Sequence, residues 1–347
     1  MTQDSGSTNR RGFLQTSVGL GVAGVAALGR TRSAVAAPVE RAKRLPREVW
    51  VASLSLHRLE ARTHEEMNHK VLKRLEEVEP FQPDVVCLPE VFPFMKTSVR
   101  PPLAEVAETP PGSISSQFAE WAKANDCYLI CPIYTRQDGK FYNAAVVIDR
   151  DGNCLGEYRK IHPTVSEMER GVAPGPLEPP VFQTDFGTIG VQICYDINWH
   201  EGWNKLRQAG AEIVFWPSAF CGGNMLNALA WMNKFCVVSS TRFDPTKIVD
   251  ITGEDLAVSG RARNWVCTPI NLEKVFLHGW PYWTRYNDVQ AKYGRKVLIR
   301  HFWEEGWSIL ESRSPDLQIA DVLREFDIRT HEEHIARADT MQAERRR

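Results

Sequence analysis

The sequence has 347 residues, of which 43% are hydrophobic and 24% are charged, and its formal net charge is -1 at pH 7. This composition is typical of a globular protein with a core of enzyme size. The near-zero charge excludes the basic field that gathers nucleic acid or acidic lipid, so we expect no nucleic-acid partner.

The N-terminal segment has the parts of a twin-arginine export signal in the expected order. Paired arginines at 10–11 precede a Phe-Leu pair, a weakly apolar stretch covers 18–28, and an Ala-Val-Ala sequence at 34–36 resembles a cleavage site. The apolar stretch is glycine-rich and too short to span a membrane. We therefore expect residues 1–37 to be a signal peptide that directs the folded protein to the bacterial periplasm or beyond, the alternative being an extension that stays on the chain.

The eight cysteines include no C-x-x-C pair, so zinc-ribbon spacing is absent and we expect no metal. Cys87, Cys131, Cys194 and Cys236 lie in apolar runs with strand character. Because folded export implies folding in a reducing cytosol, we expect mostly free, buried thiols.

From about residue 46, short apolar runs alternate with helical patterns. Strands are expected over 49–56, 85–88, 128–133, 144–148, 154–158, a run ending at Cys194, 213–216 and 236–241. Helices are expected from the face formed by Met67, Val71, Leu75 and Val78, from 113–122 with Ser113 as N-cap, and over 200–209 and 224–235. The turn at 149–153 predicts a hairpin between two of the strands. These mixed units indicate one α/β domain over 46–280, a sheet protein covered by helices.

The C-terminal part, 281–347, is expected to be an extension with packing or oligomer contacts. Its aromatic run at 278–286, with Trp303 and Trp307, has no basic stripe for stacking nucleic-acid bases. We expect these rings to pack against the domain's own flank or a neighbouring subunit. His331 and His334 lack the H-E-x-x-H spacing of a metal site, so a polar helix face is expected there.

Three chemically active side chains each follow an apolar strand. Cys194 ends an alternating run and precedes Tyr195-Asp196, as expected for a nucleophile at a sheet edge. Glu90 follows the run at 85–88 and suits a general base, and Lys160 follows 154–158 and suits stabilisation of a thiolate or an oxyanion. Alone, each has an ordinary alternative: a core cysteine, a capping carboxylate and a surface lysine.

Together and in this order, LPEVF, YRKIHP and GVQICYDINW resemble the motifs of the nitrilase, or carbon–nitrogen hydrolase, superfamily. The resemblance implies a four-layer α-β-β-α sandwich that assembles into homo-oligomers, dimers or larger. It implies Glu90 as general base, Lys160 as the cation over the tetrahedral intermediate, Cys194 as nucleophile, and the Tyr195 N–H in the oxyanion hole. It also implies a second glutamate, which is either Glu167 or Glu169.

The resemblance extends to the substrate-binding segments. Asn198-Trp199-His200-Glu201 stands where many relatives carry Arg and then Phe-Pro-Glu, which implies a bulkier and less cationic pocket wall around Asn198 and Trp199. Trp216 and Ser218 lie in a segment that resembles the family's substrate-facing strand, the alternative being simple core packing.

We therefore expect an amidase-type hydrolase that cleaves a non-peptide C–N bond of a small molecule through a thioester on Cys194, without a cofactor. The alternatives are a nitrilase, an N-carbamoyl amide hydrolase or an amine-accepting transferase of the same superfamily, and a binding protein that keeps the fold without turnover. A papain-like Cys-His hydrolase would need a dedicated histidine, and His162, His200 and His278 have no local signature for that role.

Overall fold

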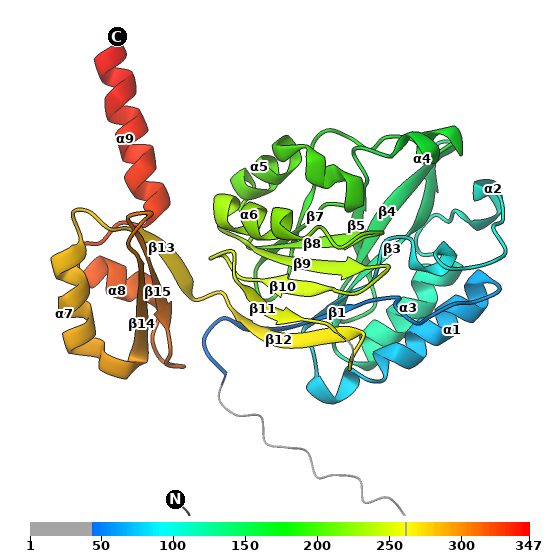
Figure 1. Ribbon diagram of the computed structural model, residues 1–347, viewed down its shortest axis with the longest axis horizontal. Helices are drawn as coiled ribbons and strands as arrows, with labels where there is room; N and C mark the ends of the chain where they lie inside the picture. Colours follow the sequence, from blue (N-terminus) through cyan, green and yellow to red (C-terminus); the bar gives the residue numbers. More distant parts are fainter. Residues whose placement is uncertain (1–43, 261) are drawn as a thin grey trace, which may run out of the picture. The chain divides into compact units, whose positions relative to one another are not determined.

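The computed structural model describes residues 44–260 and 262–347 (Figure 1), so the expected signal peptide lies outside the described residues. Two six-stranded sheets form the body. The first has the order β12 (Trp265–Asn271), β1 (Glu48–Leu54), β2 (Val85–Cys87), β3 (Tyr128–Gln137), β4 (Lys140–Ile148), β5 (Cys154–Arg159). The second has the order β11 (Asp255–Val258), β10 (Lys247–Val249), β9 (Cys236–Thr241), β8 (Ile213–Ser218), β7 (Thr188–Val191), β6 (Val181–Gln183).

Alternation along the strands separates two cores. On β1, Val49 and Val51 belong to the core between the two sheets, whereas Ala52 and Leu54 belong to a core on the outer face. The inner core also holds Ile189 and Val191 of β7, all without solvent exposure. Because successive strand side chains point to opposite faces, each sheet presents one apolar face to the other sheet and one to helices.

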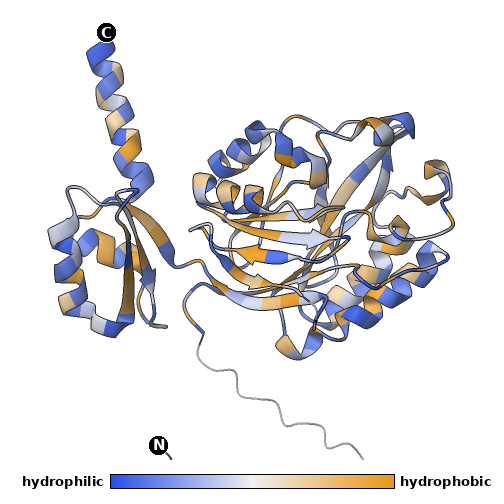
Figure 2. Cartoon of the chain, in the orientation of Figure 1, coloured by the Kyte–Doolittle hydropathy of each residue, from blue (hydrophilic) through white to orange (hydrophobic). Residues whose placement is uncertain are grey.

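The helices close the outer faces (Figure 1). The first sheet is covered by α1 (His64–Leu75) and α3 (Ser113–Ala124), and the second by α5 (His200–Gln208) and α6 (Asn224–Asn233). Figure 2 shows hydrophobic and hydrophilic residues alternating along these helices, as one-sided packing requires. The predicted α-β-β-α sandwich is therefore confirmed.

Two local details differ from the prediction. The N-cap of α3 is Gly112 rather than Ser113, and the Glu108 carboxylate accepts hydrogen bonds from the N–H groups of Ile114 and Ser115, both at 2.8 Å. Glycine contributes no cap oxygen, so a carboxylate outside the helix supplies it. The strand before Cys194 ends at Val191, three residues earlier than expected, because the chain there turns into the short helix η3 (Cys194–Asn198).

The C-terminal residues form a third sheet, in the order β13 (Lys274–His278), β15 (Trp307–Ser312), β14 (Val297–Phe302). This sheet shares a core with α7 (Trp283–Tyr293) and α8 (Ile319–Glu325), and α9 (His331–Arg346) follows them with no buried residue. Trp307 stacks on Trp231 of α6, with ring centroids 5.1 Å apart, so this aromatic residue does pack against the domain's own flank.

All eight cysteines are free, and five of them are buried, as expected. The His334 ring on α9 stacks on His278, with centroids 4.3 Å apart. Over the described ranges, no group of three or more His, Cys, Asp or Glu side chains is arranged to hold a metal ion. Within the same ranges, no helix combines the length and apolar character that crossing a bilayer requires.

Candidate active site

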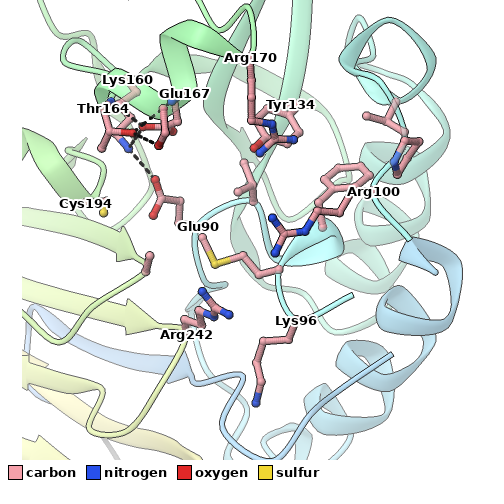
Figure 3. A pocket seen from close by; sticks show the side chains of 17 residues that line it. Glu90, Lys96, Arg100, Tyr134, Lys160, Thr164, Glu167, Arg170, Cys194 and Arg242 are labelled. Atoms are coloured by element: carbon pink, nitrogen blue, oxygen red, sulfur yellow. Dashed lines mark hydrogen bonds and ion pairs between the residues drawn. The ribbon is translucent and has the colours of Figure 1, made fainter. Parts of the chain in front are cut away.

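Glu90 lies between β2 and the short helix η2 (Phe92–Phe94), and it is only 2% exposed. The next residue, Val91, has a φ of +33°. A β-branched residue in the left-handed region is strained, which is common where the surrounding structure fixes a functional side chain. The strain therefore lies at the turn that directs the Glu90 carboxylate inward (Figure 3).

Lys160 directly follows β5 and is 1% exposed. Its Nζ donates hydrogen bonds to Glu90 Oε1 and Glu167 Oε2, both at 2.8 Å. Burial opposes the charge on Lys160, but the nearby Glu90, Cys194 and Glu167 groups outweigh burial and raise the pKa of the ammonium. The buried lysine is therefore a permanent cation held between two carboxylates.

Glu167 belongs to the short helix α4 (Val165–Glu169) and caps it. Its Oε2 accepts from the Thr164 N–H at 2.7 Å, and its own N–H donates to Thr164 Oγ1 at 3.3 Å. Burial acts to raise the pKa of Glu167, but the Lys160 cation overcomes this and lowers it. Glu169, the alternative second glutamate, is exposed and does not line the cavity, so the structure brings Glu167 and not Glu169 to Lys160.

Asn143 on β4 is a member of this cluster that the sequence analysis missed. It has no solvent exposure, and its Nδ2 donates to Glu90 Oε1 at 2.8 Å and to Glu167 Oε1 at 2.7 Å. One amide therefore orients both carboxylates around the ammonium. The available signal was a polar residue at the start of the apolar run 144–148.

Cys194 opens η3 with a φ of +48° and is 6% exposed. Such a conformation in a non-glycine residue costs on the order of 1–3 kcal/mol, and the rest of the fold must impose it. Burial raises the pKa of the Cys194 thiol to about 12, Glu90 adds to the rise, and Lys160 opposes it. The thiol is therefore protonated at neutral pH, although Lys160 favours the thiolate as expected.

Asp196 connects the cysteine segment to the lysine segment. This fully buried carboxylate accepts from the Ile193 N–H at 3.0 Å on one side. On the other side it accepts from the Tyr158 hydroxyl and the His162 N–H, both at 2.8 Å. Since Ile193 precedes the nucleophile candidate and Tyr158 and His162 flank Lys160, one side chain fixes both sheet edges relative to each other.

The four charged or nucleophilic candidates line one cavity (Figure 3). Glu90, Lys160 and Glu167 form its acid–cation wall, and Cys194 lies beside Glu90. The remaining lining comes from four cationic and several apolar or small residues: Lys96, Arg100, Arg170, Arg242, Val91, Phe94, Met95, Pro101, Val106, Tyr134, Thr164, Ser166 and Ala219.

The five residues expected to bind substrate lie around Cys194 rather than along this cavity lining. Tyr195 is the second residue of η3, where the first N–H groups of a helix have no intrahelical acceptor, so its N–H is available to an oxyanion. The Asn198 amide donates to the Tyr195 carbonyl at 2.9 Å, and the Trp199 ring stacks on His162 with centroids 3.9 Å apart.

The other two lie behind the nucleophile. Trp216 has no solvent exposure, and its Nε1 donates to the Cys194 carbonyl at 3.1 Å. Ser218 is also fully buried; its hydroxyl accepts from the Phe220 N–H at 3.0 Å and hydrogen-bonds the Cys194 thiol, which lowers the thiol pKa against the larger effect of burial. Both residues support Cys194 from the core, and direct contact with substrate at either remains a prediction.

Comparison with known proteins identifies the family of this fold. Residues 51–274 match the carbon–nitrogen hydrolase family. The nitrilase and fragile histidine triad fusion protein of Drosophila melanogaster is 37% identical over 142 residues, which are 38% of this chain and 30% of that protein. The deaminated glutathione amidase of Mus musculus is 33% identical over 160 residues, which are 42% of this chain and 48% of that protein. The matched part thus spans less than half of either relative.

A solved structure shows the same fold. The amidase from Nesterenkonia sp. superposes with a TM-score of 0.56 and 19% identity, over 64% of this chain and 90% of that one. The segment matched to the family begins within β1 and ends at the start of β13, so it includes strands of both large sheets.

Proposed function

Because this chain belongs to the carbon–nitrogen hydrolase family, and is a hydrolase of C–N bonds, we propose that it acts as an amidase through Cys194, Glu90 and Lys160. The observation that carries the proposal is the buried Lys160 ammonium shared by two carboxylates in the cavity that Cys194 lines. Relatives named as amidases support an amide substrate.

The first step is nucleophilic attack. Glu90 takes the thiol proton as the Cys194 sulfur bonds to the amide carbonyl carbon, and the carbonyl π electrons move to oxygen. Protonation of Glu90 leaves Lys160 with one charged carboxylate partner instead of two. The ammonium then interacts more strongly with the new negative charge, which the Tyr195 N–H also stabilises.

The second and third steps release the products. The oxyanion reforms the carbonyl, the C–N bond breaks, and the departing nitrogen takes the proton from Glu90 as ammonia or an amine leaves. Water then gives a proton to Glu90 as its oxygen bonds to the thioester carbonyl carbon. The C–S bond breaks, the sulfur takes the proton back from Glu90, and the carboxylic acid leaves. Glu167 keeps its charge throughout and, with Asn143, holds the cation in place.

The test is ammonia release from a panel of short amides and the matching nitriles, with Cys194→Ala beside Cys221→Ala as a part-buried cysteine control. We expect amides to be hydrolysed and nitriles not, and Cys194→Ala to lose at least about a thousandfold in kcat. Hydrolysis of nitriles alone would indicate a nitrilase instead. Full activity of folded Cys194→Ala, with Cys221→Ala as active as the parent, would refute the assignment.

We also propose export by the twin-arginine route, which the paired arginines and the following apolar stretch of the sequence support. Cell fractionation of the full chain tests it. Replacement of both Arg10 and Arg11 by lysine is expected to keep the protein in the cytoplasm, and unchanged export of that variant would contradict the proposal.

A further inference from the structure

The cavity beside Cys194 is cationic although the whole chain is close to neutral. Five cationic side chains line it, against two carboxylates, Glu90 and Glu167. Both carboxylates already contact Lys160. The lining therefore carries three more positive than negative charges.

Three of these cations are arginines from separate segments. Arg100 lies between η2 and α2 (Leu103–Val106), Arg170 is the C-cap residue of α4, and Arg242 directly follows β9. Figure 3 shows Arg242 below Glu90, with Arg100 and Arg170 farther along the cavity. Among the described residues, none of the three forms an ion pair with a carboxylate.

Arg242 carries a second, independent indication. Its Nε is buried and has no hydrogen-bond acceptor within the described part of the chain. A buried donor without an acceptor is costly, and a charged donor more so. An anion bound at this guanidinium would supply the missing acceptor.

Lys96 shows that positive charge is crowded here. Burial lowers the pKa of Lys96, and Arg242 and Arg74 lower it further against the opposing effect of Glu60. Its Nζ donates to the Leu56 carbonyl at 3.2 Å, so this ammonium is already partnered. The three guanidinium groups remain as the free donors, and their planar geometry suits carboxylate or phosphate oxygens.

We infer that Arg100, Arg170 and Arg242 form an anion-binding subsite in the cavity of Cys194, which selects an amide that carries a carboxylate or phosphate group away from its reacting carbonyl. This inference rests on the proposed function. The sequence analysis expected less positive charge around Asn198 and Trp199, and the arginines that line the cavity come from three other segments.

Binding to folded Cys194→Ala, measured by calorimetry, tests the subsite without turnover. The ligands are ω-carboxy primary amides with two to four methylenes, their ω-phosphono counterparts, N-acyl amino acids, and neutral amides of equal length. The first two place the anion on the acyl side and the third on the amine side, so they also show which half of the substrate the arginines bind.

At low salt we expect one anionic series to bind at least about tenfold more tightly than its neutral match, since charge-assisted hydrogen bonds discriminate strongly. Arg100→Gln, Arg170→Gln and Arg242→Gln should each reduce this preference, and Arg242→Lys should restore only part of it because the planar fork is lost. Arg324→Gln, at a side chain 76% exposed on α8, is the matched control and should change nothing.

Equal binding of anionic and neutral amides, or a preference that survives all three substitutions, would overturn the inference. If the parent protein hydrolyses none of these amides while Cys194→Ala still prefers the anionic ones, the result would count against the proposed function and leave the subsite standing.

Discussion

Lys160→Met isolates the effect of the buried cation on stability. The methionine nearly preserves the volume of the side chain but removes the charge that contacts Glu90 and Glu167 at 2.8 Å each. Their side chains are 3% and 14% exposed, so water replaces little of the lost interaction. Breaking a buried ion pair by removing one partner costs about 3–5 kcal/mol, a large part of the 5–15 kcal/mol that stabilises a typical domain.

The pH dependence of this loss has a definite sign. In the parent protein the pKa of Glu167 is lowered, so its stabilisation is present above the unfolded carboxyl pKa and disappears as pH falls through the folded value. Without Lys160, burial remains and the pKa of Glu167 rises above the unfolded value. The variant is then most stable at acid pH and loses stability as pH rises through that folded value.

Urea unfolding at pH 5, 7 and 8 measures the effect as the change in free energy of unfolding between parent and variant. We expect this difference to grow with pH, and Lys160→Met/Glu167→Gln to recover part of it by removing one uncompensated carboxylate. Lys205→Met is the control, because Lys205 contacts two exposed glutamates at 2.7 and 2.9 Å on the surface and should change stability little. A difference that is the same at all three pH values would refute this reasoning.

Three further predictions concern neighbouring groups. Asp196→Ala removes the acceptor of the buried Tyr158 hydroxyl, the buried Ile193 N–H and the part-buried His162 N–H, and should cost about 3 kcal/mol or more by urea unfolding. Exposed Asp185→Ala should cost less than about 1 kcal/mol, and equal effects of the two substitutions would contradict the bridging role of Asp196. Glu108→Ala removes the acceptor at the start of α3 and should lower stability by about 1–2 kcal/mol in the same assay, and no change would show that the cap contributes nothing. Glu90→Gln removes a negative charge that raises the pKa of Cys194. The pH midpoint for alkylation of the Cys194 thiol should therefore fall below about 12, and amide hydrolysis should fall as well. An unchanged midpoint would argue against electrostatic coupling between Glu90 and Cys194.

Much of the fold could be predicted because its strands are short apolar runs with clear ends. The expected strand at 236–241 coincides with β9, and the turn at 149–153 does join β4 and β5 in a hairpin. The errors occur where the local pattern does not decide the structure. Glu108 caps α3 from several residues away, and a cap donated from outside the helix leaves no signature at Gly112 or Ser113.

The candidate site could be predicted where a chemically active side chain directly follows a strand. Glu90, Lys160 and Cys194 each follow an apolar run, so their convergence could be expected from sheet geometry. Asn143 lies within a strand, and its role depends on a pairing register that periodicity does not determine. The arginines could not be found in this way, since Arg100 and Arg170 are exposed loop and cap residues whose common orientation exists only in the folded chain.

The division of the site between two sheets has a consequence for the nascent chain. Glu90, Asn143 and Lys160 follow or belong to strands of one sheet, while Cys194 follows a strand of the other, and Asp196 joins the halves. A partly folded chain with only the first sheet in place would have Glu90 and Lys160 without the Cys194 thiol. A chain with only the second sheet would have the thiol without Glu90 and Lys160. The proposed reaction therefore requires both layers to be in place, so a chain with one folded layer would be unable to hydrolyse other amides.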